Sequence, residues 1–514
     1  MTRNKPLILT SLLIAAFAIN LDTTIVNVAL PSLVRELHAS TTQLQWIVDA
    51  YNLVFAALLL AAGSLSDRVG RKGVLLAGLA VFGLASLAGG ITDSPGQLIV
   101  ARGVMGLGAA LIFPATLSLI SNVFVERSER ARAIGLWGAS AGVAIALGPI
   151  VGGWLLEQFS WSSVFFAMTP VAALAALLVA RYVPTSRDPI APRADRPGVV
   201  LSTAAMAVLI YTIIEAPIHG WSSARSVTGF VLALTLGAVF VAWERRTDEP
   251  LIDLGLFRNL RFTAASASVT VVFFSLAGFI FLITQYFQFF KGYSPLSTGV
   301  HLLPVATSVG IMSVLGTRLA VRFSTKLVVA GGLMALAGFF AWVSTSSSET
   351  KYLEIAGQMI LGGSGMGLVS APATEAIMGV VPKAKAGVGS AVNDATRLLG
   401  GTLGVAVIGS VYASLFASRL TSALPASLPG DLSSRAHDSV GAALAIAHQT
   451  GLGAVHTAAS NAFFDGFSAG CLVAAGVSAA GALMAAWLLP AKPLQSEREA
   501  RSMGTVEIAS PAPS

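Results

Sequence analysis

Residues 63–72 read GSLSDRVGRK and lie between two apolar runs, at 44–63 and 74–92. One acid, three bases and two glycines give a short charged turn. A helix needs about 20 apolar residues to cross the hydrocarbon core of a bilayer, and both runs are close to that length. The stretch therefore predicts two membrane-spanning helices joined by a tight basic loop.

The composition extends this prediction to the whole chain. Of its 514 residues, 55% are hydrophobic and 11% are charged, whereas a soluble domain carries about 25% charged residues. The net charge of +7 does not indicate a nucleic-acid partner, because the basic residues lie in short loops between apolar runs. The single cysteine, Cys471, excludes an intramolecular disulfide and a thiolate metal cluster. We expect a lipid-embedded protein with no metal, no cofactor and no nucleic acid.

Apolar runs of spanning length occur fourteen times, in the order six, two, six. Their approximate positions are 9–30, 44–63, 74–92, 97–121, 132–155, 162–182, 198–217, 225–243, 263–290, 296–317, 327–345, 352–374, 386–415 and 466–489. The first run continues past Asp22 without a cleavage pattern, so we interpret it as a retained helix rather than a signal peptide. The fold class predicted is an all-α polytopic membrane protein.

The polar stretches between the runs divide the chain. We predict a six-helix bundle at 1–182, a linker with two extra spans at 183–262 and a second six-helix bundle at 263–489. The last bundle includes a long outside loop at 416–465, which is either a solvated loop with a short surface helix or a lid over the exit. The polar tail at 490–514 is predicted to be disordered and cytoplasmic.

Lysine and arginine positions give the orientation. With the N-terminus inside, most of the 32 bases fall in cytoplasmic loops, which is where membrane proteins collect them. A missed or extra span would break this alternation. We therefore expect a multi-pass protein of the cell membrane with both termini in the cytoplasm.

Three charges in separate apolar runs are predicted to meet in the outer half of the membrane. They are Asp22, Asp49 and Arg102. A charge inside the bilayer is costly and marks a functional site by default. A desolvated carboxyl beside an arginine can gain and lose a proton, so we assign these residues to proton coupling. The alternative is a fixed ion pair that only orients the bundle.

A second polar group lies in the run at 386–415 and contains Asn393, Asp394 and Arg397. Asp394 and Arg397 are three residues apart and share a helix face. They either neutralise each other or provide a second protonation or cation-binding site.

Two further motifs concern movement and packing. The loop residues Gly63, Asp67, Arg68, Gly70, Arg71 and Lys72 form either a gate latch or a plain solvated turn. The run at 132–155 carries Gly148, Pro149, Gly152 and Gly153. Small residues at such spacing allow close helix packing, so composition alone predicts a packing seam there.

Aromatic and polar side chains within spans are candidates for lining a substrate cavity. We single out Trp46, Tyr51, Gln285, Tyr286 and Phe289. Anchoring at the membrane interface is the alternative use of the Trp and Tyr residues.

Four of these segments, in order along nearly the whole chain, resemble the major facilitator superfamily. The resemblance is to its fourteen-helix drug:proton antiporter branch, the EmrB/QacA-like exporters. The segments read LDTTIVNVALP at 21–31, GSLSDRVGRK at 63–72, RGVMGLGAA at 102–110 and GPIVGG at 148–153. The first resembles the branch's helix 1 signature, and the third a motif whose arginine is associated with proton transfer. The last is associated with antiporters.

The resemblance implies two six-helix bundles around a central cavity that opens alternately to each side, with the extra helix pair at their junction. It implies a proton-coupled antiporter, not an enzyme, that works as a monomer and exports a small amphipathic drug or antibiotic. No nucleotide is expected, because the glycine runs lack the Lys-Ser/Thr of a P-loop. A transporter of one specific metabolite with the same fold is the alternative function.

The chain departs from some cation exporters of this branch. They carry an acid where Leu398 falls and another in the span that corresponds to 296–317, which here has none. Neutral and anionic cargo are therefore as open as cationic cargo.

Overall fold

The structure is a computed structural model that describes residues 4–187, 195–248, 250–252, 254–381, 386–425 and 428–490. Almost all of the tail predicted at 490–514 lies outside these residues, as do Lys383 and Lys385 of one predicted cytoplasmic loop. Every regular element in the described ranges is a helix.

The N-terminal half contains six long helices. They are α1 (Lys5–Leu37), α2 (Thr41–Val69), α3 (Arg71–Gly90), α4 (Pro95–Val123), α5 (Arg127–Gln158) and α6 (Ser163–Tyr182). Two more helices follow, α7 (Arg196–His219) and α8 (Ala224–Glu244), and then a short 3-10 helix, η1 (Leu254–Arg258).

The C-terminal half also has six long helical segments. They are α9 (Leu260–Phe289), α10 (Pro295–His301) with α11 (Leu303–Arg322), α12 (Thr325–Val343), α13 (Tyr352–Val380), α14 (Ala386–Ala423) and α17 (Gly453–Leu488). Two short helices, α15 (Gly430–Ala436) and α16 (Val440–Thr450), connect α14 to α17. The all-helical fold with fourteen long segments is as predicted.

Thirteen of the described segments are both long and apolar enough to cross a membrane. The remaining long helix, α13, has 29 residues but is rich in glycine and carries Glu354, Gln358 and Glu375. It packs against α9, α11 and α12. Its glycines let the backbones of these neighbouring helices approach closely. Helix α13 therefore packs mainly against protein and needs less apolar surface than a helix that faces lipid.

Helix ends follow local chemistry. The Ser40 side chain accepts a hydrogen bond from the Gln43 backbone, and the Gln43 side chain accepts one from the Ser40 backbone, which is a capping box at the start of α2. Gly70 separates α2 from α3 with φ of 133°, a conformation that side chains with a Cβ rarely adopt. The loop at 63–72 is therefore shorter than its sequence suggests, since α2 continues through Val69.

The predicted outside loop at 416–465 is also shorter than expected. Residues 416–423 continue α14, and α17 begins at Gly453 rather than near residue 466. Helices project beyond the hydrocarbon, whereas the apolar pattern ends where the hydrocarbon ends, so the prediction placed the end of α14 too early and the start of α17 too late.

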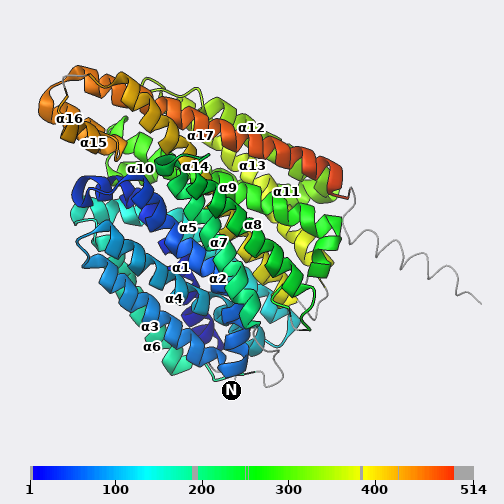
Figure 1. Cartoon of the computed structure of the whole chain (residues 1–514). Coiled ribbons are helices and arrows are strands. Elements are labelled where there is room, and N and C mark those ends of the chain that lie inside the picture. The colour runs from blue at the N-terminus through cyan, green and yellow to red at the C-terminus, as the bar shows by residue number, and fades with distance from the viewer. Residues whose placement is uncertain are drawn as a thin grey trace, which may run out of the picture.

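The two halves lie side by side, with the N-terminal helices in blue and cyan and the C-terminal helices in green to red (Figure 1). Helix α7 packs against both α2 and α14, so the extra pair lies where the halves join. The halves also meet directly where α2 packs against α14, α5 against α10, and α1 against α9, α10 and α16.

Hydrogen bonds between the halves lie toward the outer ends of the helices. Gln288 on α9 donates to the carbonyl of Val28 on α1 at 2.9 Å. Gln45 on α2 donates to the carbonyl of Ala406 on α14 at 3.1 Å. The structure is therefore closed on the outer side.

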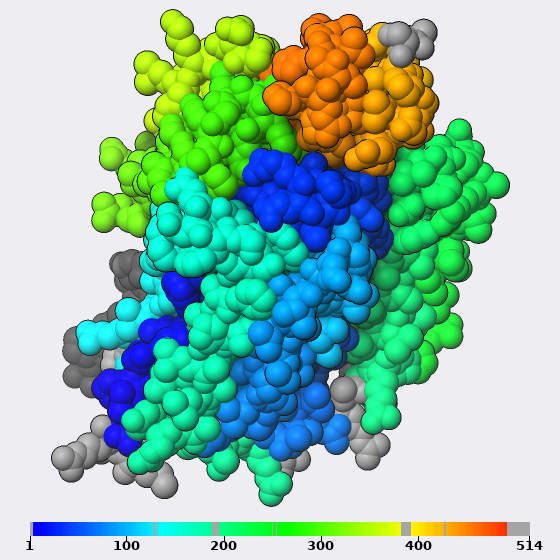
Figure 2. Space-filling model, turned by 90° about the vertical axis from the view of Figure 1, so that its left-hand side faces the viewer, coloured from blue at the N-terminus to red at the C-terminus, as the bar shows by residue number. Residues whose placement is uncertain are grey.

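The α15–α16 segment lies over the outer end of α1. In Figure 2 its orange surface sits against the blue surface of the N-terminal helices. The Thr41 backbone donates to the Asp438 carbonyl at 2.8 Å. A Cβ at Gly441 would lie 2.6 Å from Val34 and 2.7 Å from Phe289. The segment is thus packed onto both halves, and its role as a lid stays a prediction.

Candidate functional site

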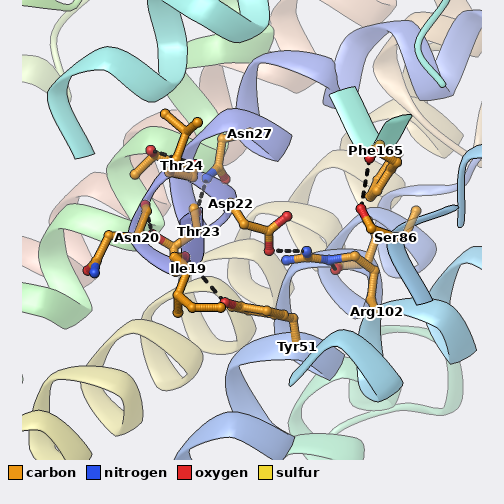
Figure 3. A network of polar contacts seen from close by, with 12 residues as sticks. Ile19, Asn20, Asp22, Thr23, Thr24, Asn27, Tyr51, Ser86, Arg102 and Phe165 are labelled. Atoms are coloured by element: carbon orange, nitrogen blue, oxygen red, sulfur yellow. Dashed lines mark hydrogen bonds and ion pairs between the residues drawn. The ribbon is translucent and has the colours of Figure 1, made fainter. Parts of the chain in front are cut away.

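An ion pair between α1 and α4 forms the centre of the site. The Asp22 Oδ2 atom lies 2.5 Å from Arg102 Nη1, and both side chains are 1% exposed (Figure 3). Both side chains are more deeply buried than those of the ion pairs Lys5–Glu129, Asp67–Arg71, Glu215–His219 and Arg419–Asp465. The second oxygen of Asp22, Oδ1, is buried and accepts no hydrogen bond from a described residue. One carboxyl oxygen is therefore paired with Arg102, and the other is available to accept a proton.

Helix α2 holds the arginine from a second direction. Arg102 Nε donates to the Ile47 carbonyl at 2.9 Å, and its guanidinium lies 4.2 Å from the centre of the Tyr51 ring. The Tyr51 hydroxyl in turn donates to the Ile19 carbonyl on α1 at 3.3 Å. Arg102 therefore connects α1, α2 and α4, and it keeps two contacts if Asp22 loses its charge.

Asp49 does not join this pair. It is fully buried on α2, and neither carboxyl oxygen has a hydrogen-bond partner among the described residues. An ionised carboxylate without any partner is very costly away from water. Of the three predicted proton-coupling residues, the structure brings Asp22 and Arg102 together and leaves Asp49 separate.

The 63–72 loop is cross-linked within the N-terminal half. Asp67 Oδ1 accepts hydrogen bonds from Arg71 Nε at 2.7 Å and from Ser118 on α4 at 3.0 Å. Lys72 reaches the Ala180 carbonyl at the end of α6 at 2.8 Å, while Arg68 is exposed. The loop is therefore bonded to α4 and α6 and is more than a solvated turn. Its role as a gate latch stays a prediction.

The glycines near the outer end of α5 lie against two other helices. A Cβ at Gly152 would lie 2.7 Å from Ile25 on α1, and Gly148 faces Thr24 on the same helix. A Cβ at Gly153 would lie 2.5 Å from the Leu296 backbone on α10, and the Pro149 carbonyl faces Gly299. The segment therefore packs closely against α1 on one side and against α10 of the C-terminal half on the other.

The polar group on α14 contacts the neighbouring helix α13, and both predicted roles for Asp394 and Arg397 stay predictions. Arg397 Nη2 donates to Thr374 Oγ1 on α13 at 3.2 Å, and the same hydroxyl lies 3.4 Å from Asn393 Oδ1. Within the described residues, no ion pair joins Asp394 to Arg397. Asp394 and Arg397 share a helix face, but the guanidinium donates its hydrogen bond to Thr374 on the preceding helix, α13.

A pocket of about 450 Å³ opens beside this group. Its lining consists of Ser313 from α11, Arg397 from α14 and five residues of α13, namely Ser370, Ala371, Thr374, Glu375 and Met378. Sequence reasoning missed Glu375, because the apolar run was ended at residue 374 while α13 continues to Val380. Continuing the predicted helix from residue 374 to the basic residues Lys383 and Lys385 would have included Glu375.

The five predicted cavity residues are not brought together. Tyr51 belongs to the Arg102 cluster, whereas Trp46 packs against Tyr211 of α7 with ring centres 6.2 Å apart. On α9, Gln285 donates to the Phe281 carbonyl of its own helix, and the Tyr286 hydroxyl donates to the Ser347 carbonyl. Phe289 packs against the α15–α16 segment. In this conformation they do not share a cavity, and a substrate role for them stays a prediction.

Comparison with known proteins identifies the family to which the chain is similar. A sequence model of the Major Facilitator Superfamily matches residues 12–405. The multidrug resistance protein Stp of Mycobacterium tuberculosis is 38% identical over 411 residues, which are 80% of this chain and 76% of Stp. The multidrug efflux pump LfrA of Mycolicibacterium smegmatis is 35% identical over 77% of this chain and 78% of its own.

Solved structures agree on the fold. A bacterial homologue of the human lysosomal transporter Spinster, in an inward-facing conformation, superposes with a TM-score of 0.67. The match covers 95% of this chain and 98% of that chain, at 15% sequence identity. Together with the six–two–six helix order and the Asp22–Arg102 pair, these matches mean that the chain belongs to the Major Facilitator Superfamily, in its fourteen-helix branch.

Proposed function

We propose that the protein is a proton-coupled antiporter that exports amphipathic drugs or antibiotics across the cell membrane by alternating access. The observation that carries the proposal is the buried Asp22–Arg102 ion pair, which has one open carboxyl oxygen. Relatives that share about four-fifths of the chain bear the names of multidrug resistance and efflux proteins, which supports drugs as the class of cargo.

Protonation of Asp22 is the step that uses the proton gradient. A proton on Oδ1 removes the negative charge and weakens the hold of α1 on Arg102. The guanidinium stays in place through the Ile47 carbonyl and the Tyr51 ring. The charge change is therefore felt mainly by α1, which becomes free to move relative to α2 and α4.

Helix α1 connects this step to the outer contacts. The Val28 carbonyl, six residues beyond Asp22, accepts from Gln288 of the opposite half, and Ile25 packs against Gly152 of α5. Movement of α1 would loosen these contacts and open the outer side. Loss of the proton to the cytoplasm would restore the ion pair and the closed outer side. A membrane potential supplies about 2.3 kcal/mol per charge per 100 mV to this cycle.

Proton movement in everted membrane vesicles tests the coupling. Respiration acidifies the vesicle interior, and an acridine dye reports the pH difference by fluorescence quenching. Addition of a transported drug should release protons and restore fluorescence in the wild type and in Asp93→Asn, an exposed outer-loop control. Asp22→Asn should give no response. Drug accumulation that is undiminished after a protonophore collapses the gradient would refute proton coupling.

A further inference from the structure

Asp49 is a buried carboxyl that the proton-coupling scheme does not use. It lies on α2, about 12 Å from the outer end of the helix at Thr41, and its side chain is fully buried. Neither carboxyl oxygen has a hydrogen-bond partner among the described residues. An ionised carboxylate in such a place costs far more free energy than a neutral carboxyl, so the protonated form is the one that fits the site.

The helices around Asp49 are described without a gap at its depth in the membrane. Helix α2 is described along its whole length, and it packs against α7 and α14. Helix α14 is described from Ala386, about 28 Å before Val405, and α7 from Arg196, about 21 Å before Ile210. The gaps next to these helices in the described ranges therefore adjoin their inner ends, whereas Asp49 lies in the outer part of α2.

Asp49 faces the contact that closes the outer side. Gln45 and Leu53 lie one turn before it and one turn after it, on the same helix face. Gln45 donates to the Ala406 carbonyl of α14 at 3.1 Å. Leu53 belongs to one buried cluster with Ala406 and with Ile213 of α7. Asp49 is therefore enclosed where α2 of the N-terminal half meets α7 and α14.

Neighbouring helices do not provide a charge that replaces the proton. The titratable side chains nearest in depth are Asp22 on α1, Arg102 on α4, Tyr211 and Glu215 on α7 and Tyr412 on α14. Asp22 and Arg102 pair with each other, and Tyr211 accepts from Arg225. Helix α3 carries its bases, Arg71 and Lys72, at its inner end. Within the described chain none of these groups bonds to Asp49.

The neighbouring Gln45 provides an acceptor for that proton. Its amide nitrogen donates to α14, whereas its Oε1 atom is buried and accepts no hydrogen bond from a described residue. Side chains four residues apart on a helix can meet. A protonated Asp49 has an O–H that can donate to Gln45 Oε1, whereas an ionised Asp49 has only acceptors. The proton therefore supports the Gln45–α14 contact.

We propose that Asp49 is a second proton-binding residue of the transport cycle, which takes up a proton from the outside when the outer side closes and returns it when the outer side opens. Opening separates α2 from α14 and admits water, in which an aspartate ionises above about pH 4. The proposal rests on the alternating access of the proposed function and adds an external proton as a requirement for closure. Because this proton returns to the side from which it came, it does not add to the protons exchanged for drug.

Spin-label distances across the outer side test the proposal in the full-length protein in lipid nanodiscs. The labels replace Asp93 and Glu349, exposed outer positions on opposite halves, in a Cys471→Ser background. Asp22→Asn is also present, so that Asp22 does not titrate. The closed state holds the proton more tightly, so closure is favoured at low pH. The ratio of outside-open to outside-closed molecules should rise at least about tenfold from about pH 5 to about pH 8, since one proton changes it by up to about tenfold per pH unit.

Two substitutions added to this labelled protein identify the titrating group. Asp49→Asn is neutral at every pH and keeps an N–H donor, so it should favour the closed state and lose the pH response. The matched control is Asp431→Asn, the same change at an exposed residue of α15, which should keep the response. The proposal is overturned if the ratio is the same at both pH values, if Asp49→Asn keeps the response, or if the control loses it as well.

Infrared spectroscopy provides a second measurement that does not depend on movement. In the Asp22→Asn protein near neutral pH, replacing Asp49 by Asn should remove the carbonyl band of one protonated carboxyl. Identical spectra before and after the replacement would show that Asp49 holds no proton and would overturn the proposal. Both measurements use neither a drug nor a proton gradient, so a failure here is distinct from a failure of proton-coupled export.

Discussion

The Asp22–Arg102 pair illustrates how a single buried charge depends on its partner. Both side chains are 1% exposed, so each would be left in an apolar surrounding without the other. Removing one member of a buried pair costs about 3–5 kcal/mol, mainly because the remaining charge is unpaired. Arg102 has additional partners on α2, whereas the second carboxyl oxygen of Asp22 has no hydrogen-bond partner among the described residues.

We therefore predict that Arg102→Met destabilises the protein by about 3–5 kcal/mol and that adding Asp22→Asn recovers part of this loss. Thermal unfolding in detergent of the two single variants and the double variant measures the coupling. If the double variant loses as much stability as the two single variants lose together, the pair contributes no mutual stabilisation.

The sequence predicted some residue contacts and missed others for identifiable reasons. The meeting of Asp22 with Arg102 followed from the depth of each residue in its span. Depth does not specify which way a side chain faces on its helix, so the isolation of Asp49 and the bonding of Arg397 to Thr374 were not predictable. Glu375 was missed because a span boundary was placed a few residues too early.

At the scale of elements, the outer end of α5 is where close packing joins the halves. Gly153 meets the α10 backbone, whereas Gly142 on the same helix has open space around it. Overpacking of a well-packed contact costs about 1–3 kcal/mol, and here the cost would fall on the outer-closed conformation.

We predict that Gly153→Leu lowers drug efflux several-fold, while Gly142→Leu leaves it within a factor of about two. Efflux is measured in cells with expression levels matched by immunoblot. Equal effects of the two substitutions would show that side-chain size on α5, rather than the α5–α10 contact, controls transport.

The α15–α16 segment gives a pH prediction. Burial raises the pKa of Asp438 above its usual value of 3.8, although the positive charges of Arg435 and His437 act in the opposite direction. A carboxyl with a raised pKa in the folded state binds its proton more tightly when folded. The stability of the docked segment is therefore highest at low pH and declines as the pH rises from 3.8 through the raised value.

Amide hydrogen exchange of α16, corrected for intrinsic rates, should be slower at pH 4 than at pH 7 in the wild type. Asp438→Asn removes the titrating group and should remove most of this difference. If the variant keeps the full pH dependence, the effect arises from another group.

Helix number and order were predictable, and helix ends were not. Fourteen apolar runs gave fourteen long segments because the hydrocarbon core imposes one length on every span. The extensions of α14 and α17 past the membrane carry polar residues, so no hydropathy signal marks them. The positions of α15 and α16 depend on contacts with α1 and α17, which lie far away in the sequence.

For the molecule as a whole, the structure is closed outside, and Gln45 contributes strongly to that closure. Its amide nitrogen lies within hydrogen-bonding distance of the Val405 and Ala406 carbonyls and of Ser410. A Cβ at Gly409 would lie 2.6 Å from the same amide. Replacement of this side chain would leave the halves joined at the outer side by fewer polar contacts.

We predict that Gln45→Leu shifts the population toward the outside-open state by roughly tenfold, since each hydrogen bond contributes about 1 kcal/mol. Spin labels at Asp93 and Glu349, exposed outer positions on opposite halves, report the change as longer distances in a Cys471→Ser background. Gln97→Leu, on the exposed start of α4, is the control. An unchanged distance distribution in Gln45→Leu would show that the Gln45 hydrogen bonds do not stabilise the outside-closed state.

The central claim is that Asp22 carries the proton that drives export. Purified protein in liposomes with an imposed pH gradient measures uphill drug accumulation and, without a gradient, drug–drug exchange. We predict that Asp22→Asn loses uphill accumulation and also slows exchange, because a neutral side chain cannot restore the ion pair with Arg102 that closes the outer side. Uphill accumulation at the wild-type rate in Asp22→Asn would contradict the account.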